Sequence, residues 1–132
     1  MGPCYGPLMA TRDDIRAIAA TLPEVEIDDE AMHLSVIGGK QLLWPWLERV
    51  HPKKARVPNP DIVNIRIAHE SDKAVLLEMD PDAFFTDPHF DGWPGIQVRL
   101  AAIDPGLLRE LLRTAWRVGS PRSLLARVEL PD

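Results

Sequence analysis

The sequence predicts a single α+β domain, in which an antiparallel β-sheet carries two long helices on one face. Two segments, 11–22 and 104–119, place apolar residues at helical spacing behind a capping signal. Several other segments alternate apolar and polar residues, as antiparallel strands with one buried face do. At 132 residues and 45% hydrophobic content, the chain is suited to one hydrophobic core. Together these observations predict two layers, one of helices and one of sheet.

The first helix is expected to begin after Thr11. Thr11 and Asp14 have the spacing of a capping box, and Ile15 and Ile18 open an apolar stripe that ends before Pro23. Residues 1–10 contain glycine and proline without a hydrophobic period, so we expect a flexible lead there. Residues 11–128 would then form the domain, with residues 24–30 as an acidic link after the first helix.

A β-hairpin is predicted next. Residues 32–37 and 40–44 are two β-type runs separated by Gly38 and Gly39, and a type I′ turn needs positive φ at both central positions. Pro45 marks the end of the second strand or an edge position. Trp44 and Trp46 would face the same side of that strand. We expect them in the core beneath the helices, the alternative being an exposed pair that stacks on bases or anchors a protein.

The middle of the chain is interpreted as a loop rich in proline and basic residues (47–60), a strand (61–68), a short helix (74–79) and a turn. Residues 95–100 form a further strand, and Asp104 caps the last helix, which ends at Gly119. Val63 and Val98 would then lie under the helices. The opposite face of the sheet would carry four polar residues, free for contacts: Asn64, Arg66, Gln97 and Arg99.

Composition limits the classes of function. The single cysteine excludes an internal disulfide framework and favours a reducing, cytoplasmic location, and no apolar run approaches the length of a membrane span. The net charge of −5 argues against tight, indiscriminate nucleic-acid binding, although residues 51–70 carry four basic and two acidic groups. No phosphate-binding glycine loop or nucleophile motif is present, so we expect no enzyme and no cofactor.

The chain also resembles a known family over residues 11–127. Residues 84–104 read F-F-T-D-P-H-F-D-G-W-P-G-I-Q-V-R-L-A-A-I-D, with residues 87–99 as the most specific part, and an L-x-E-L-L-x-x-A-W helix follows. This pairing, with V-I-G-G-K earlier in the chain, resembles the MmcQ/YjbR family. The resemblance implies a small α+β fold, similar in shape to frataxin-like proteins. It also implies DNA binding, the label that members commonly carry, and it supplies no catalytic residues.

Three functional hypotheses follow, of which the third, an unrecognised enzyme, has no residues assigned to it. The first is a non-enzymatic nucleic-acid-binding domain that contacts phosphates through five cations: Lys53, Lys54, Arg56, Arg66 and Arg99. Five such contacts would give weak, salt-sensitive DNA binding with a salt slope of roughly −4.5. The alternative for the basic loop is an ordinary solvated surface.

The second hypothesis is a module that binds a protein or a small ligand through Trp44, Trp46, His89 and Trp93. Asp87, His89 and Asp91 alternate in a pattern that could present metal ligands. Three ligands within five residues do not easily surround an ion, so we expect turn hydrogen bonds and no metal. Arg109, Arg113 and Arg117 share a helical face that we interpret as solvated or paired with acidic neighbours, the alternative being contact with a phosphate or a partner. The sequence leaves the oligomeric state open.

Overall fold

The fold is built on a six-stranded antiparallel sheet with the strand order β1-β2-β3-β4-β6-β5. It is seen in a computed structural model that describes residues 9–49 and 51–130. Most of the predicted flexible lead, including Cys4, lies outside the described residues. The elements in chain order are α1 (Arg12–Ala19), β1 (Val25–Asp28), β2 (His33–Val36), β3 (Gln41–Glu48), β4 (Val57–Arg66), α2 (Asp72–Met79), β5 (Phe84–Phe85), η1 (Pro88–Phe90), β6 (Gly95–Arg99), η2 (Leu100–Ala102), α3 (Pro105–Gly119) and α4 (Arg122–Arg127).

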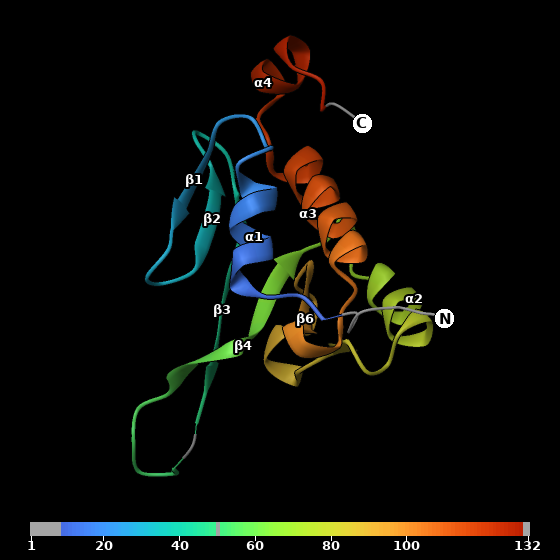
Figure 1. Ribbon diagram of the computed structural model, residues 1–132. Coiled ribbons are helices and arrows are strands. Elements are labelled where there is room, and N and C mark those ends of the chain that lie inside the picture. Colours follow the sequence, from blue (N-terminus) through green and yellow to red (C-terminus); the bar gives the residue numbers. More distant parts are fainter. Residues whose placement is uncertain (1–8, 50, 131–132) are drawn as a thin grey trace, which may run out of the picture.

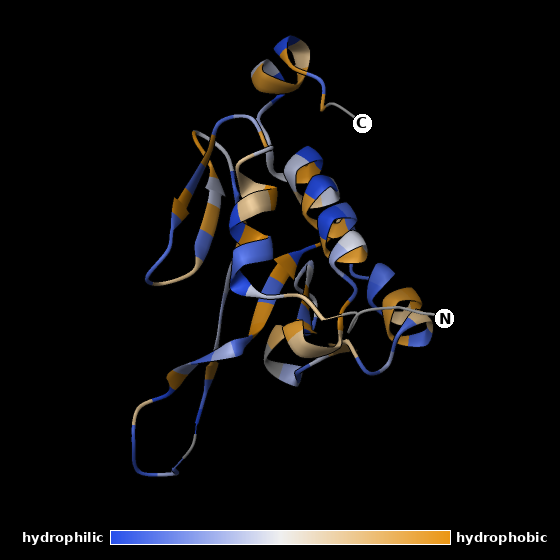
Figure 2. Ribbon diagram, in the orientation of Figure 1, coloured by the Kyte–Doolittle hydropathy of each residue, from blue (hydrophilic) through white to orange (hydrophobic). Residues whose placement is uncertain are grey.

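Helices α1 and α3 pack on the same face of this sheet, so the predicted α+β architecture is confirmed (Figure 1). A row of apolar side chains crosses four neighbouring strands on that face, because the registers align them: Leu34, Leu43, Ile65 and Ile96. Val63 and Val98 form part of the next row, and all six side chains are buried. The hydrophobic stripes of both helices close the core over these rows (Figure 2).

Both predicted helix starts are confirmed. Thr11 and Asp14 form a reciprocal capping box at α1. At α3, Asp104 Oδ2 accepts a hydrogen bond from the Leu107 amide at 3.2 Å, and Pro105 occupies the first helical position. Ser71 does precede α2, but its side chain makes no capping bond.

Asp104 makes a capping hydrogen bond and Ser71 does not, and this difference gives a first prediction. Asp104→Ala should lower the free energy of unfolding by about 1 kcal/mol, because it leaves an amide at the start of α3 without its acceptor. Asp104→Asn should retain most of the stability. Ser71→Ala serves as the matched control and should change little, since that hydroxyl caps nothing. Urea unfolding followed by circular dichroism measures all three; equal losses at both caps would contradict the assignment.

Three predictions about secondary structure are wrong. The acidic link after α1 contains an edge strand, β1, which pairs with β2. Strand β4 has ten residues and begins at Val57, so Pro58 and Pro60 lie in a strand where a loop was expected. Strand β6 pairs with β4 only from Ile62 onward, so both prolines precede the part of β4 that has neighbours on two sides. At the hairpin turn, only Gly38 has positive φ, at 74°, so the type I′ geometry is also wrong.

The long β3–β4 hairpin extends beyond the body of the domain as an arm (Figure 1). We define the arm as residues 47–58. Its tip is hydrophilic (Figure 2) and carries the basic residues predicted for this region. No helix in the described part of the chain is long and apolar enough to cross a membrane.

Candidate functional site

Five aromatic side chains gather on the sheet face opposite α1 and α3. This aromatic cluster consists of Trp44, Trp46, Phe85, Phe90 and Trp93. The ring centroids of Trp44 and Trp93 lie 6.1 Å apart, those of Trp46 and Phe85 5.4 Å apart, and those of Trp46 and Phe90 6.1 Å apart. Two of the contacts are edge-to-face, an arrangement that aromatic quadrupoles favour.

Strand register explains why the cluster forms there. Trp44, Asn64, Gln97 and Phe85 lie opposite one another in a single row across β3, β4, β6 and β5. The tryptophans therefore lie on the face away from the helices and are only half-buried. The expectation that Trp44 and Trp46 belong to the core beneath the helices is wrong, and the alternative of an exposed pair describes them better.

The polar face predicted for the sheet exists, but its centre is not open. Asn64 is 1% exposed and Gln97 is fully buried. Gln97 Nε2 donates to Asn64 Oδ1 at 2.8 Å, and Asn64 Nδ2 donates to the Pro45 carbonyl at 3.1 Å. Gln97 Oε1 has no donor within reach among the described residues. The prediction of a free face is thus wrong at these two positions, which are buried.

A cavity of about 150 Å³ opens between the aromatic cluster and the base of the arm. Asn64 reaches it from the sheet, and Arg56 reaches it from the arm. The residues that line it are Trp44, Pro45, Trp46, Leu47, Arg56, Asn64, Asp87 and Phe90. Aromatic and polar side chains therefore line the same small cavity.

Two of the predicted cations flank the aromatic cluster. The guanidinium carbon of Arg99 lies 4.4 Å from the Phe85 ring centroid, and Arg99 Nη1 donates to the Asp82 carbonyl at 3.1 Å. Arg56 Nη1 donates to the Leu47 carbonyl at 3.3 Å beside the cavity. A cation–π contact and a carbonyl bond hold the Arg99 guanidinium, and a carbonyl bond holds that of Arg56; neither contact neutralises the charge.

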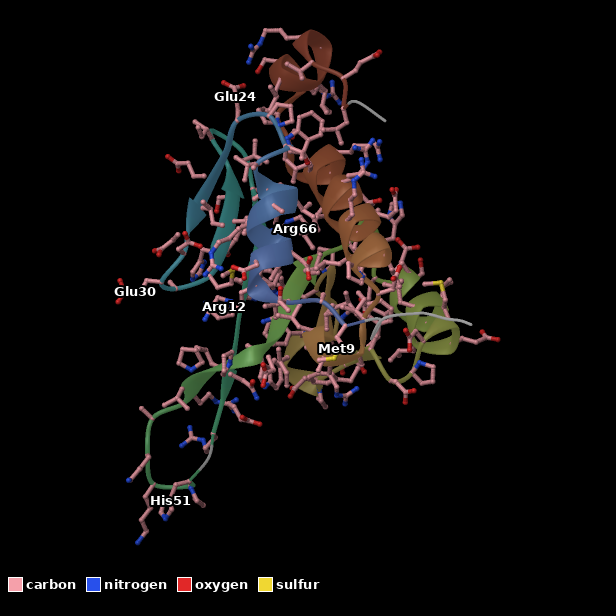
Figure 3. The ribbon with its side chains drawn as sticks, in the orientation of Figure 1. Met9, Arg12, Glu24, Glu30, His51 and Arg66 are labelled. Carbon is pink, nitrogen blue, oxygen red and sulfur yellow. The ribbon has the colours of Figure 1, made fainter. Side chains whose placement is uncertain are left out.

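Lys53 and Lys54 lie at the exposed tip of the arm, next to His51 (Figure 3). Arg49, which the sequence interpretation missed, ties the tip together: its Nη1 donates to the carbonyls of Pro52 and Lys54 at 3.1 and 3.0 Å. The signal that could have found Arg49 is its place beside a proline-containing loop, where free carbonyls need donors.

Arg66 lies apart from the other predicted cations. Its Nε donates to the Gln41 carbonyl at 2.7 Å, and burial lowers the pKa of its guanidinium, which still remains charged at neutral pH. Arg66 pairs with Gly95 and Arg99 pairs with Ile62. Four residues of strand separate these positions, or about 13 Å. The five cations therefore do not form one continuous patch.

The remaining predicted residues divide between the described and undescribed parts. Trp93 is 51% exposed at the rim of the cluster, whereas the side chain of His89 lies outside the described residues. Within the described residues, no group of three or more His, Cys, Asp or Glu side chains could hold a metal ion. Arg113 is buried and has partners, so the solvated stripe predicted on α3 is wrong at that position.

The chain is similar in amino-acid sequence to mycobacterial proteins. Uncharacterized protein Rv2570 of Mycobacterium tuberculosis is 37% identical over 123 residues, which cover 89% of this chain and 94% of that protein. Uncharacterized protein Mb2600 of Mycobacterium bovis matches equally well. The chain belongs to the family of these mycobacterial proteins. The aligned region covers most of both chains.

No family model and no solved structure matches the chain. The names of the Rv2570-family relatives describe no activity. The features that bear on function are therefore the aromatic cluster, the cavity and the cations around them.

Proposed function

We propose that this member of the Rv2570 family is a non-enzymatic nucleic-acid-binding domain that binds single strands. The observation that carries the proposal is the aromatic cluster, flanked by Arg56 and Arg99 and adjoining an arm with a basic tip. Proteins that bind single strands combine exposed rings, on which bases stack, with cations that follow the phosphates. The resemblance of residues 84–104 to the MmcQ/YjbR family supports the same class of function.

Single strands fit the surface better than a duplex does. Trp93 is exposed, Trp44 and Trp46 are half-buried, and stacking on such rings needs unstacked bases as partners. In a duplex the bases are stacked inside, so the tryptophans would gain little. The net charge of −5 keeps affinity modest and sensitive to salt.

The proposal predicts the salt dependence of binding. Lys53, Lys54, Arg56 and Arg99 supply four phosphate contacts once Arg66 is set aside, so log Kd should change with log salt with a slope of magnitude about 2.8 for a single strand. Fluorescence anisotropy of a labelled mixed-sequence oligonucleotide, measured between low and physiological salt, gives this slope. The same strand annealed to its complement should bind more weakly.

A charge variant tests the arm directly. The double variant Lys53→Gln/Lys54→Gln should reduce the magnitude of the slope by about 1.4, because two contacts are lost. Arg117→Gln/Arg122→Gln is the matched control: it removes the same charge from exposed positions on α3 and α4 and should leave the slope unchanged. Absence of binding at low salt would refute the proposal. If the salt slope falls equally in both double variants, the change reflects net charge and not contacts made by the arm.

A further inference from the structure

We infer that the cavity beside Trp46 holds one unstacked pyrimidine base of the bound strand. This inference rests on the proposed function and specifies which part of the ligand the cavity takes. Three features of the cavity carry it: its size, its aromatic walls and the buried amide that reaches it from the sheet.

The size favours one ring. The cavity measures about 150 Å³. An enclosed apolar cavity of about this volume in another protein admits benzene, so one six-membered ring fills the space, whereas the fused rings of a purine would have to extend out through the opening. The cavity is open on one side, so the sugar and phosphate of the same nucleotide can remain outside.

The walls suit a neutral aromatic ring. Trp44, Trp46 and Phe90 present three ring systems to the cavity, and Leu47 adds an aliphatic surface. Arg56 lies where it can meet a phosphate at the opening. Asp87 also lines the cavity. A base is neutral and carries its negative charge on the adjoining phosphate, which matches this distribution.

The amide of Asn64 supplies hydrogen bonds to the base. An asparagine side chain has two donor hydrogens and two acceptor lone pairs. One donor is used by the Pro45 carbonyl and one acceptor by Gln97, which leaves one of each. Every base presents a neighbouring donor and acceptor on the edge used in base pairing, the pyrimidines included, so Asn64 can bond a base edge while the size of the cavity, and not this amide, favours a pyrimidine.

The buried amide pair satisfies the Pro45 carbonyl and is bonded internally, but one of its acceptors has no partner in the part of the chain that the structure describes. Asn64 and Gln97 occupy the centre of the sheet, where apolar side chains would pack without needing partners, and Gln97 Oε1 has no donor among the described residues. Buried polar groups with unmade bonds are rare and need an explanation. Orienting the Asn64 amide toward a ligand provides one.

Homopolymer strands test the inference. We expect labelled oligo(dT) to bind about 10-fold more tightly than oligo(dA) of the same length in low salt, by anisotropy. Trp46→Leu should weaken oligo(dT) binding about 10-fold, because it removes a stacking partner, with the salt slope unchanged. Trp46→Phe keeps an aromatic wall and should restore most of the affinity.

The amide is tested by the double variant Asn64→Leu/Gln97→Met. Replacing both partners by apolar side chains leaves fewer unsatisfied groups than replacing one, so the domain should stay folded. We expect the preference for oligo(dT) to fall to less than about threefold. Thermal melting by circular dichroism verifies folding; if the double variant does not fold, the Trp46 pair carries the test.

The outcomes separate the two proposals. If strands bind with the expected salt slope, but pyrimidine preference is absent or unchanged in the folded variants, the base pocket is refuted and nucleic-acid binding stands. If no strand binds in low salt, both are refuted. Pyrimidine preference that is lost in Trp46→Leu and in the double variant, and retained in Trp46→Phe, establishes the pocket.

Discussion

Replacing Trp116 by alanine should lower the free energy of unfolding by about 3–5 kcal/mol, the range for deleting a large buried aromatic side chain. Trp116 is 1% exposed and belongs to the buried face of α3. Its Nε1 donates to the Pro23 carbonyl at 2.8 Å, so the indole also fixes the chain between α1 and β1. Urea unfolding monitored by circular dichroism gives the change.

Trp116→Phe separates packing from hydrogen bonding. The phenyl ring fills much of the same space but has no N–H, so the Pro23 carbonyl loses its donor, and the loss should be about 1–3 kcal/mol. Alanine should therefore cost more than phenylalanine. A loss below about 1 kcal/mol for Trp116→Ala would contradict the burial of the indole in the core.

Replacing Gly39 by alanine should destabilise the domain by about 1–3 kcal/mol, because it overpacks a close contact between the β2–β3 turn and the end of α3. A Cβ at Gly39 would lie 2.5 Å from the Gly119 carbonyl oxygen and 3.1 Å from Pro121 Cδ. The Gly119 carbonyl also accepts a hydrogen bond from the Lys40 amide at 2.9 Å. This bond ties the turn to the end of α3, so the backbone at Gly39 cannot easily move away from an added Cβ.

Gly38 provides the matched control. It lies in the same turn with φ of 74°, and a Cβ there would meet nothing within 4 Å. Asparagine tolerates this left-handed conformation, so Gly38→Asn should cost little. Thermal and urea unfolding compare the variants. If Gly38→Asn proves as costly as Gly39→Ala, the close approach to α3 is not what requires glycine at position 39.

The helices could be predicted from the sequence because their signals are local. Thr11 with Asp14, and Asp104 with Pro105, each act within one turn of helix, and both caps form as predicted. Strand β1 has no comparable signal. Only two apolar residues, Val25 and Ile27, alternate with acidic ones there, and the strand exists because β2 offers it an unpaired edge.

The side taken by the tryptophans could not be predicted for a specific reason. Alternation requires Trp44 and Trp46 to share a face, but the inward parity depends on whether Leu42 or Leu43 points to the core. The β2–β3 register shifts at this point, and both leucines are fully buried. Counting from Leu42 places the tryptophans under the helices, whereas counting from Leu43 places them on the opposite face, where they lie.

The candidate site could be predicted only in part. The basic residues of the arm were evident from composition, and Arg99 was evident from strand alternation. The proximity of Arg99 to Phe85, and of Arg56 to Asn64, depends on how four strands align, which no local pattern specifies. The separation of Arg66 from the other cations has the same origin, because it follows from the register of β4 against β6.

The two outer strands bear on how copies of the molecule coexist at high concentration. Strand β1 carries Glu26 and Asp28 along its four residues, and β5 at the opposite border has only two residues. The carboxylates of β1 repel the same strand of a second molecule. A two-residue edge strand offers a second molecule too few backbone amides to extend the sheet. Crowded copies should therefore resist joining into continuous fibrils, even though the interior of each sheet is strongly apolar.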